Sequence, residues 1–132
     1  MNEYRILVVD DEEDLCEILK FNLENEGYEV DTANSAEDAL KMDISTYDLL
    51  LLDVMMGEIS GFKMASMLKK EKKTAKIPII FITAKDTEND TVTGFNIGAD
   101  DYISKPFSLR EVAARVKAVL RRTRQTETER AP

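Results

Sequence analysis

The sequence predicts an α/β fold in which a doubly wound, five-stranded parallel sheet carries helices on both faces. Short apolar runs rich in β-branched residues alternate along the chain with segments of helical periodicity, and this alternation is typical of a parallel sheet. The runs at 49–52 and 79–82 are apolar at every position, as expected of strands covered on both faces. With 132 residues, the chain has room for one such domain.

The strands are expected where short apolar runs end in polar or turn residues. They lie at Arg5–Val9, Glu29–Thr32, Leu49–Leu52, Pro78–Ile82 and Asp101–Ile103. Each is followed by a segment of helical character. For five strand–helix units the common strand order is 2-1-3-4-5, which places a switch point between the first and third strands.

Three helices are marked by apolar residues spaced to share one face. These residues are Leu15, Ile18, Leu19 and Leu23, then Phe62, Ala65, Met67 and Leu68, then Val112, Ala113, Val116, Val119 and Leu120. Gly27 ends the first helix, Ser35 can cap a further short one, and Ser108 with Glu111 forms a capping box before the last. A weaker helix is expected over Thr87–Ile97, because it contains a glycine and three consecutive β-branched residues.

Residues 123–132 are polar and have no apolar periodicity. They are predicted to form a linker or a frayed tail. Residues 1–122 would then make up the folded domain.

Composition and charge exclude several classes of function. The chain has 18 basic and 26 acidic residues and a formal charge of -8, so most of its surface repels nucleic acid. It has no histidine, which removes the usual zinc ligand and the usual general base. One cysteine allows no intrachain disulfide, and no apolar run approaches the length of a membrane span. We expect no signal peptide and a cytoplasmic location.

The polar residues at the strand ends are the candidate functional residues. Asp10 and Asp11 end the first strand, Asp53 the third and Thr83 the fourth, while Lys105 follows the fifth. Parallel strands bring these ends to one edge of the sheet, where ligands bind in such folds. Three carboxylates there would repel one another unless a cation sat among them, and magnesium is the first candidate.

Such an edge is suited to phosphoryl transfer. Asp53 is the best nucleophile candidate, because it follows the most apolar strand near the middle of the edge. A metal ion and Lys105 would neutralise phosphoryl oxygens, and Thr83 could donate its hydroxyl to one of them. Each residue taken alone is better explained as a turn, cap or surface residue. Their joint occurrence at the ends of four strands favours the site.

Two other functions remain open at this point. A magnesium-dependent phosphohydrolase would also use an aspartyl nucleophile, but it needs a nearby general acid and a cap over the site. The residue two positions after Asp53 is Met55, and no insertion is long enough for a cap. A flavin-binding module needs a phosphate-binding loop rich in Ser, Thr and Gly after the first strand. The corresponding loop, Asp10–Asp14, is acidic and would repel a phosphate.

Four stretches together resemble the receiver domain of bacterial two-component response regulators. They are Ile6–Asp11, Leu51–Met56, Ile82–Ala84 and Gly98–Phe107. The resemblance covers residues 4 to 122 and is strongest to the subfamily that carries a winged-helix DNA-binding domain downstream. It implies the flavodoxin-like receiver fold, with residues 123–132 leading toward a DNA-binding domain that this chain does not contain.

The resemblance also implies a metal site. Asp53 would be the phosphoacceptor, and Asp10 and Asp11 would hold magnesium together with Asp53 and the backbone carbonyl of Met55. Manganese could substitute for magnesium. Lys105 would pair with the phosphoryl group, and its peptide bond to the following proline would be cis.

A phosphorylation-driven switch, rather than a turnover enzyme, is what the resemblance implies. The phosphodonor would be a phosphohistidine on a separate sensor histidine kinase. Thr83 would reorient on phosphorylation and Tyr102 would turn inward with it.

The subfamily is thought to pair through its fourth helix, fifth strand and fifth helix when phosphorylated. Asp101 and Arg115 match one of its usual ion pairs, while Glu111 and Lys117 match single halves of two others. The expected partners of those halves are replaced by Thr91 and Asn96, so we expect a weak dimer. Gly57 stands where the loop after the acceptor usually has proline.

Overall fold

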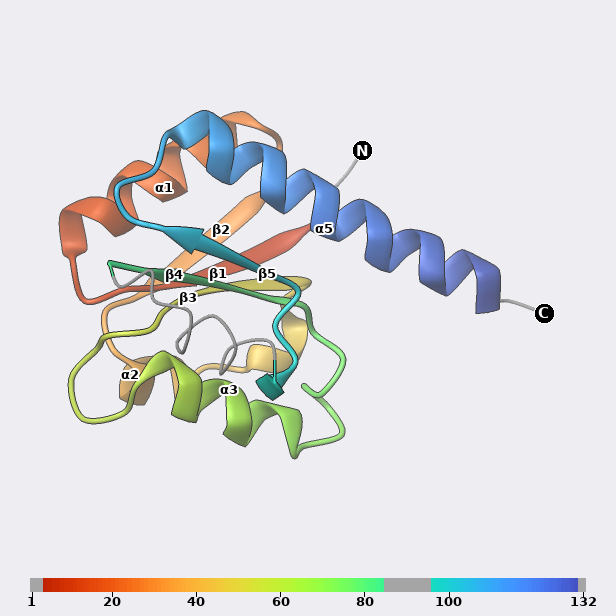
Figure 1. The fold of residues 1–132 in the computed structure, drawn as a ribbon, viewed down its shortest axis with the longest axis horizontal. Coiled ribbons are helices and arrows are strands. Elements are labelled where there is room, and N and C mark those ends of the chain that lie inside the picture. Colours follow the sequence, from red (N-terminus) through yellow and green to blue (C-terminus); the bar gives the residue numbers. More distant parts are fainter. Residues whose placement is uncertain (1–3, 85–95, 131–132) are drawn as a thin grey trace.

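The computed structural model describes residues 4–84 and 96–130, and the backbone alone for 125–130. Within these residues a five-stranded parallel sheet has the order β2-β1-β3-β4-β5, which confirms the predicted architecture (Figure 1). The strands are β1 (Arg5–Val9), β2 (Glu29–Ala33), β3 (Leu49–Asp53), β4 (Ile79–Thr83) and β5 (Asp101–Ser104).

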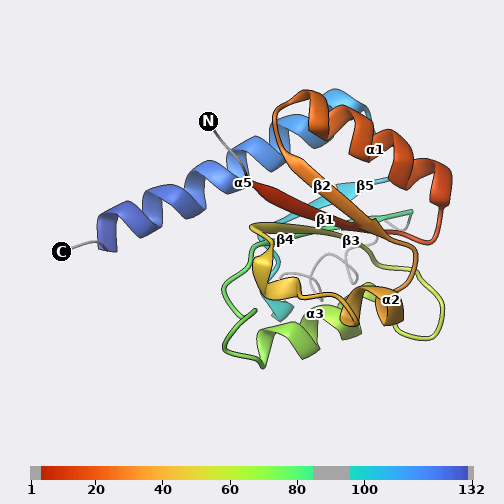
Figure 2. The ribbon, with the colours of Figure 1, turned by 180° about the vertical axis from the view of Figure 1, so that it is seen from behind.

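Helices cover both faces of the sheet (Figures 1 and 2). One layer contains α1 (Glu13–Asn25) and α5 (Leu109–Arg130), and the other contains α2 (Ala36–Leu40) and α3 (Gly61–Lys69). A short 3₁₀ helix, η1 (Ile44–Thr46), precedes β3 and was not predicted.

The predicted serine caps are present in the structure, although the Glu111 carboxylate of the predicted capping box contacts Arg115. Ser35 Oγ accepts a hydrogen bond from the backbone N–H of Asp38, and Ser108 Oγ accepts one from Glu111. The helix predicted over Thr87–Ile97 lies outside the described residues, except for positions 96 and 97, which are helical.

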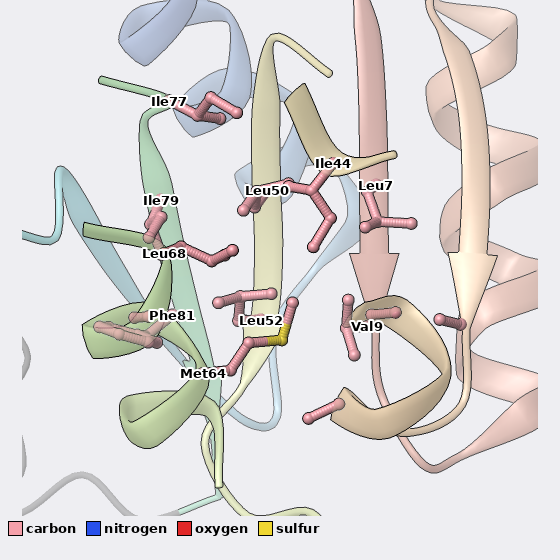
Figure 3. Close-up of a cluster of buried hydrophobic side chains, with 14 of the residues drawn as sticks. Leu7, Val9, Ile44, Leu50, Leu52, Met64, Leu68, Ile77, Ile79 and Phe81 are labelled. Atoms are coloured by element: carbon pink, nitrogen blue, oxygen red, sulfur yellow. The ribbon is translucent and has the colours of Figure 1, made fainter. Parts of the chain in front are cut away.

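The core is divided into two clusters by the sheet, because alternate residues of each strand face opposite layers. Figure 3 shows the cluster beneath α2 and α3, where Leu50 and Leu52 of β3 pack with Met64 and Leu68. The opposite cluster joins the intervening strand residues to the buried faces of α1 and α5. Each fully buried Leu or Ile side chain contributes roughly 1.5–3 kcal/mol.

Two of the predicted helix faces are rotated from their expected positions. On α1 the buried residues are Cys16, Leu19 and Leu23, while Ile18 is 47% exposed. On α3, Met64 is buried and Met67 is 40% exposed. Both segments have apolar residues around more than half of the helix, so periodicity alone does not determine which stripe faces the sheet.

The last helix is longer than predicted. It continues to Arg130 through residues expected to be linker, and it projects beyond the sheet (Figure 1). Five of the eight residues at 123–130 are Arg, Gln or Glu, which are good helix formers even without an apolar face, and the other three are Thr. Its role as a connection to another domain stays a prediction. Among the helices in the described ranges, none is both long and apolar enough to cross a bilayer.

Candidate functional site

The strand ends bring the predicted site residues to one edge of the sheet. Asp10 directly follows β1, and Asp53 ends the neighbouring strand β3. Thr83 ends β4 beside Ser104 of β5 and is fully buried. The carboxylates, the hydroxyl and Lys105 therefore come together because the parallel strands are in the expected order.

Lys105 lies between the carboxylates. Its Nζ is 3.2 Å from Asp10 Oδ2 and 3.9 Å from Asp53 Oδ1. A third carboxylate, which the sequence did not suggest, also contacts it: Lys105 Nζ donates to Glu12 Oε1 at 3.2 Å. The backbone N–H of Lys105 donates to the Thr83 carbonyl at 2.7 Å, and the Lys105–Pro106 peptide bond is cis.

Burial disfavours the ionised form of the two central carboxylates. Asp10 is 1% exposed and Asp53 is 3% exposed. Burial raises the pKa of Asp53 to about 7, and the negative charge of Asp10 adds to the rise; Lys105 and the backbone N–H of Met55 oppose it. Burial also raises the pKa of Asp10. A single ammonium group does not compensate the negative charge of this site.

The donor set fits a hard divalent cation. Asp10, Asp11 and Glu12 each offer a carboxylate oxygen, and these oxygens lie within 4.8 Å of one another. Asp10 Oδ2 is buried and accepts no hydrogen bond from the described residues, although Lys105 Nζ lies within ion-pairing distance. Carboxylate oxygens with one unsatisfied, buried acceptor are ligands of the kind that magnesium prefers.

The backbone of Asp10 is held by residues that the sequence did not suggest. Asn34 Nδ2 donates to the Asp10 carbonyl at 3.1 Å, and Cys16 Sγ donates to the same oxygen at 3.3 Å. Burial raises the pKa of Cys16 to about 11, and the charge of Asp10 adds to the rise. Cys16 therefore stays a neutral thiol that braces the site. Its position two residues after the acidic run Asp10–Asp14 was the only available signal.

The loop after Asp53 depends on a glycine that was also missed. Gly61 begins α3, and its N–H donates to the Val54 carbonyl at 3.0 Å. A Cβ at position 61 would overlap the Asp53 carbonyl oxygen, so only glycine lets α3 start this close to the acceptor. A Cβ at Gly57 would meet no atom within 4 Å, so the structure does not require glycine there.

The two expected switch residues lie on neighbouring strands. The ring of Tyr102 packs near the Phe81 ring, with centroids 6.3 Å apart, and its hydroxyl is buried. Tyr102 is paired in register with Phe81, two positions before Thr83. The Tyr102 side chain is thus partly buried against β4, and its reorientation on phosphorylation stays a prediction.

The residues expected at a dimer surface are partly paired within the chain. Arg115 contacts both Asp101 and Glu111, while Lys117 is exposed. Asn96 is exposed, and Thr91 lies outside the described residues.

Comparisons with known proteins give consistent matches. The family model of the response regulator receiver domain matches residues 6–117. The alkaline phosphatase synthesis transcriptional regulatory protein PhoP of Bacillus subtilis is 50% identical over 120 residues, which are 90% of this chain and 49% of that protein. The transcriptional regulatory protein SrrA of Staphylococcus aureus is 46% identical over 125 residues, 94% of this chain and 51% of that protein. The chain thus spans about half the length of these curated relatives.

Solved structures agree with the fold. The non-phosphorylated HemR receiver domain of Leptospira biflexa superposes with a TM-score of 0.82 at 36% identity, covering 89% of this chain and 94% of that one. The response regulator protein TrrA of Thermotoga maritima, in complex with Mg(2+)-BeF, gives a TM-score of 0.77 at 42% identity, covering 88% and 98%.

Proposed function

Since the chain belongs to the response regulator receiver domain family, we propose that it is a phosphorylation-driven signalling switch whose phosphoacceptor is Asp53. One observation carries the assignment. Asp53 is a buried carboxylate at the edge of the sheet, and the Lys105 ammonium lies 3.9 Å away, where it can neutralise an incoming phosphoryl group.

The proposed transfer is a displacement at phosphorus. The ionised carboxylate of Asp53 attacks the phosphorus of a phosphohistidine on a sensor histidine kinase. The bond between phosphorus and the imidazole nitrogen breaks, and the electron pair leaves with the imidazole. Lys105 stabilises the charge on the transferred oxygens, and the Thr83 hydroxyl donates a hydrogen bond to one of them.

We assign the metal site to Asp10, Asp11, Asp53 and the backbone carbonyl of Met55, with magnesium as the ion and manganese as a substitute. The buried, unsatisfied oxygen of Asp10 and the raised pKa of Asp53 support this assignment. When bound, the ion supplies positive charge that lowers the carboxylate pKa values and neutralises phosphoryl oxygens. The relative TrrA is described in complex with Mg(2+)-BeF.

We propose that phosphorylation changes two things, namely the dimerisation of the chain and the activity of a downstream domain. Phosphorylation would act through Thr83 and Tyr102 on the surface formed by β5 and α5, and would favour a homodimer there. Two curated relatives are transcriptional regulators about twice as long as this chain. We therefore propose that residues 1–122 are a receiver that controls a DNA-binding domain, with 123–132 leading toward it. We further propose a cytoplasmic location, as exchange with a histidine kinase requires, and a role as a switch that turns over no substrate.

The test of the acceptor is a mass measurement. With magnesium and an acyl phosphate as donor, the intact protein should gain the mass of one phosphoryl group. Asp53→Asn should abolish the gain, since an amide is no nucleophile toward phosphorus, and chelation of the metal should do the same. Asp48→Asn, at an exposed carboxylate outside the site, is the matched control and should label like wild type. Undiminished labelling of Asp53→Asn would overturn the assignment.

A further inference from the structure

The Lys105 ammonium is shared unequally among its carboxylate partners. Nζ lies 3.2 Å from Glu12 Oε1 and 3.2 Å from Asp10 Oδ2, but 3.9 Å from Asp53 Oδ1. Its hydrogen bond is made to Glu12. The lysine thus points toward the loop after β1 and is withdrawn from the proposed acceptor.

Backbone hydrogen bonds hold Glu12 in place, so its side chain is not needed to fix the start of α1 and can contact Lys105. The Glu12 N–H donates to Asp10 Oδ1 at 2.9 Å, and its carbonyl accepts from the Cys16 N–H at 3.1 Å. Glu12 is the N-cap residue of α1, yet its side chain makes no capping hydrogen bond. Replacing the carboxylate by an amide therefore removes the negative charge that faces Lys105 and keeps the start of the helix.

We propose that Glu12 is a positioning residue that competes with Asp53 for Lys105 and thereby slows phosphoryl transfer. The inference rests on the proposed function, because Lys105 must meet the transferred oxygens at Asp53. To do so, the ammonium exchanges the Glu12 carboxylate for a phosphoryl oxygen, and no covalent bond of either side chain changes.

The expected size of the effect follows from exposure. The Glu12 side chain is 63% exposed, while that of Lys105 is only 16% exposed. Ion pairs with one exposed partner are weak, and their loss shifts an equilibrium by up to about fivefold. Glu12→Gln should therefore accelerate transfer by about two- to fivefold rather than by orders of magnitude.

The experiment measures the initial rate of phosphorylation by an acyl phosphate, read from intact mass over a titration of magnesium. Glu12→Gln should raise the rate at saturating magnesium and leave the half-saturating concentration unchanged. Glu13→Gln is the matched control, because it removes the same charge one residue further along at an exposed position. Among the described residues, Lys105 makes no ion pair with Glu13. Glu13→Gln should change the rate of phosphorylation by less than half of the change that Glu12→Gln causes.

A double-mutant cycle isolates the lysine. In a Lys105→Ala background, where the slow phosphorylation is followed over hours, Glu12→Gln should have no further effect on the initial rate. An equal acceleration in that background, or in Glu13→Gln, would show that Glu12 acts by general charge repulsion and would overturn the proposal. A higher magnesium requirement in Glu12→Gln would make Glu12 a metal ligand instead. If the wild-type protein gains no phosphoryl group at all, the proposed function itself fails. If the wild type is labelled but the effects of Glu12→Gln and Lys105→Ala simply add, only the role of Glu12 fails.

Discussion

Arg115 Nη1 lies 2.9 Å from one carboxylate oxygen of Asp101 and 3.0 Å from the other, so α5 is tied to β5 within a single chain. The Nε of the same guanidinium donates to Glu111 at 3.1 Å. The dimer expected from the sequence uses these same three charged groups between two chains. A dimer must therefore share or exchange ion pairs that the monomer already has, which reduces the free energy gained by pairing.

The first prediction concerns that dimer. Unphosphorylated, dilute protein should be a monomer, and beryllofluoride-treated protein should form a weak dimer. Asp101→Arg should weaken the dimer, because it sets two positive charges against each other. Adding Arg115→Asp should partly restore it, because the ion pair forms again with its charges exchanged. Each effect counts twice, since the two-fold axis duplicates each contact. Each exposed pair contributes only about 0–1 kcal/mol. Sedimentation decides the matter: a tight dimer insensitive to both charge reversals would mean that another surface pairs.

The second prediction concerns the switch. Thr83→Ala should still be phosphorylated at Asp53 but should respond weakly, because the hydroxyl that links the phosphoryl group to β4 is gone. A full switch from 1:99 to 99:1 requires about 5.5 kcal/mol of differential stabilisation. The measurement is the change in the NMR resonances of Tyr102 on addition of beryllofluoride and magnesium. Thr83→Ser retains the hydroxyl and should retain the response. An undiminished change at Tyr102 in Thr83→Ala would contradict the coupling.

The third prediction is a dependence of stability on pH in the presence of a chelator. The pKa of Asp53 is raised from 3.8 to about 7, so between about pH 4 and pH 7 the folded state binds more protons than the unfolded state. The free energy of unfolding should therefore fall as the pH rises through this window. Asp53→Asn lacks the ionising group and should be more stable than wild type at pH 8, by at most about 4 kcal/mol.

Denaturant unfolding of both proteins at several pH values measures this difference, which should vanish near pH 4. Magnesium should restore stability to wild type more than to Asp53→Asn, since a ligand that binds the folded state stabilises it. Equal stabilities at pH 8 without metal would show that burial of Asp53 costs little.

The fourth prediction compares two glycines of the acceptor loop. Gly57→Ala should stabilise the protein by about 0.4–1 kcal/mol, because its Cβ meets open space and the unfolded chain loses freedom. Gly61→Ala should destabilise by more than about 1 kcal/mol and slow phosphorylation, since its Cβ overlaps the Asp53 carbonyl. Thermal unfolding and labelling rates of the pair test this. Equal effects of the two substitutions would show that the close approach of α3 to Asp53 is not needed.

The central residues of the candidate site were predictable because their positions follow from strand order. Once β1, β3 and β4 are adjacent and parallel, the residues that end them must share an edge. Glu12, Asn34 and Gly61 were not predictable in the same way. Their contributions to the site depend on the direction of a side chain, or on how closely α3 approaches Asp53. Neither of these produces a periodic pattern in the sequence.

The fold class, the strand order and the sheet edge that holds Asp10, Asp53 and Lys105 were all predictable from the sequence. These follow from alternating strand-like and helical patterns, which reflect local burial preferences along the chain. By contrast, the contact of Lys105 with Glu12 and the pairing of Asp101 with Arg115 inside one chain became visible only in the folded structure. The choice of an ion-pair partner depends on differences of less than an ångström, such as 3.2 against 3.9 Å, and such distances are set by the packing of elements far apart in sequence.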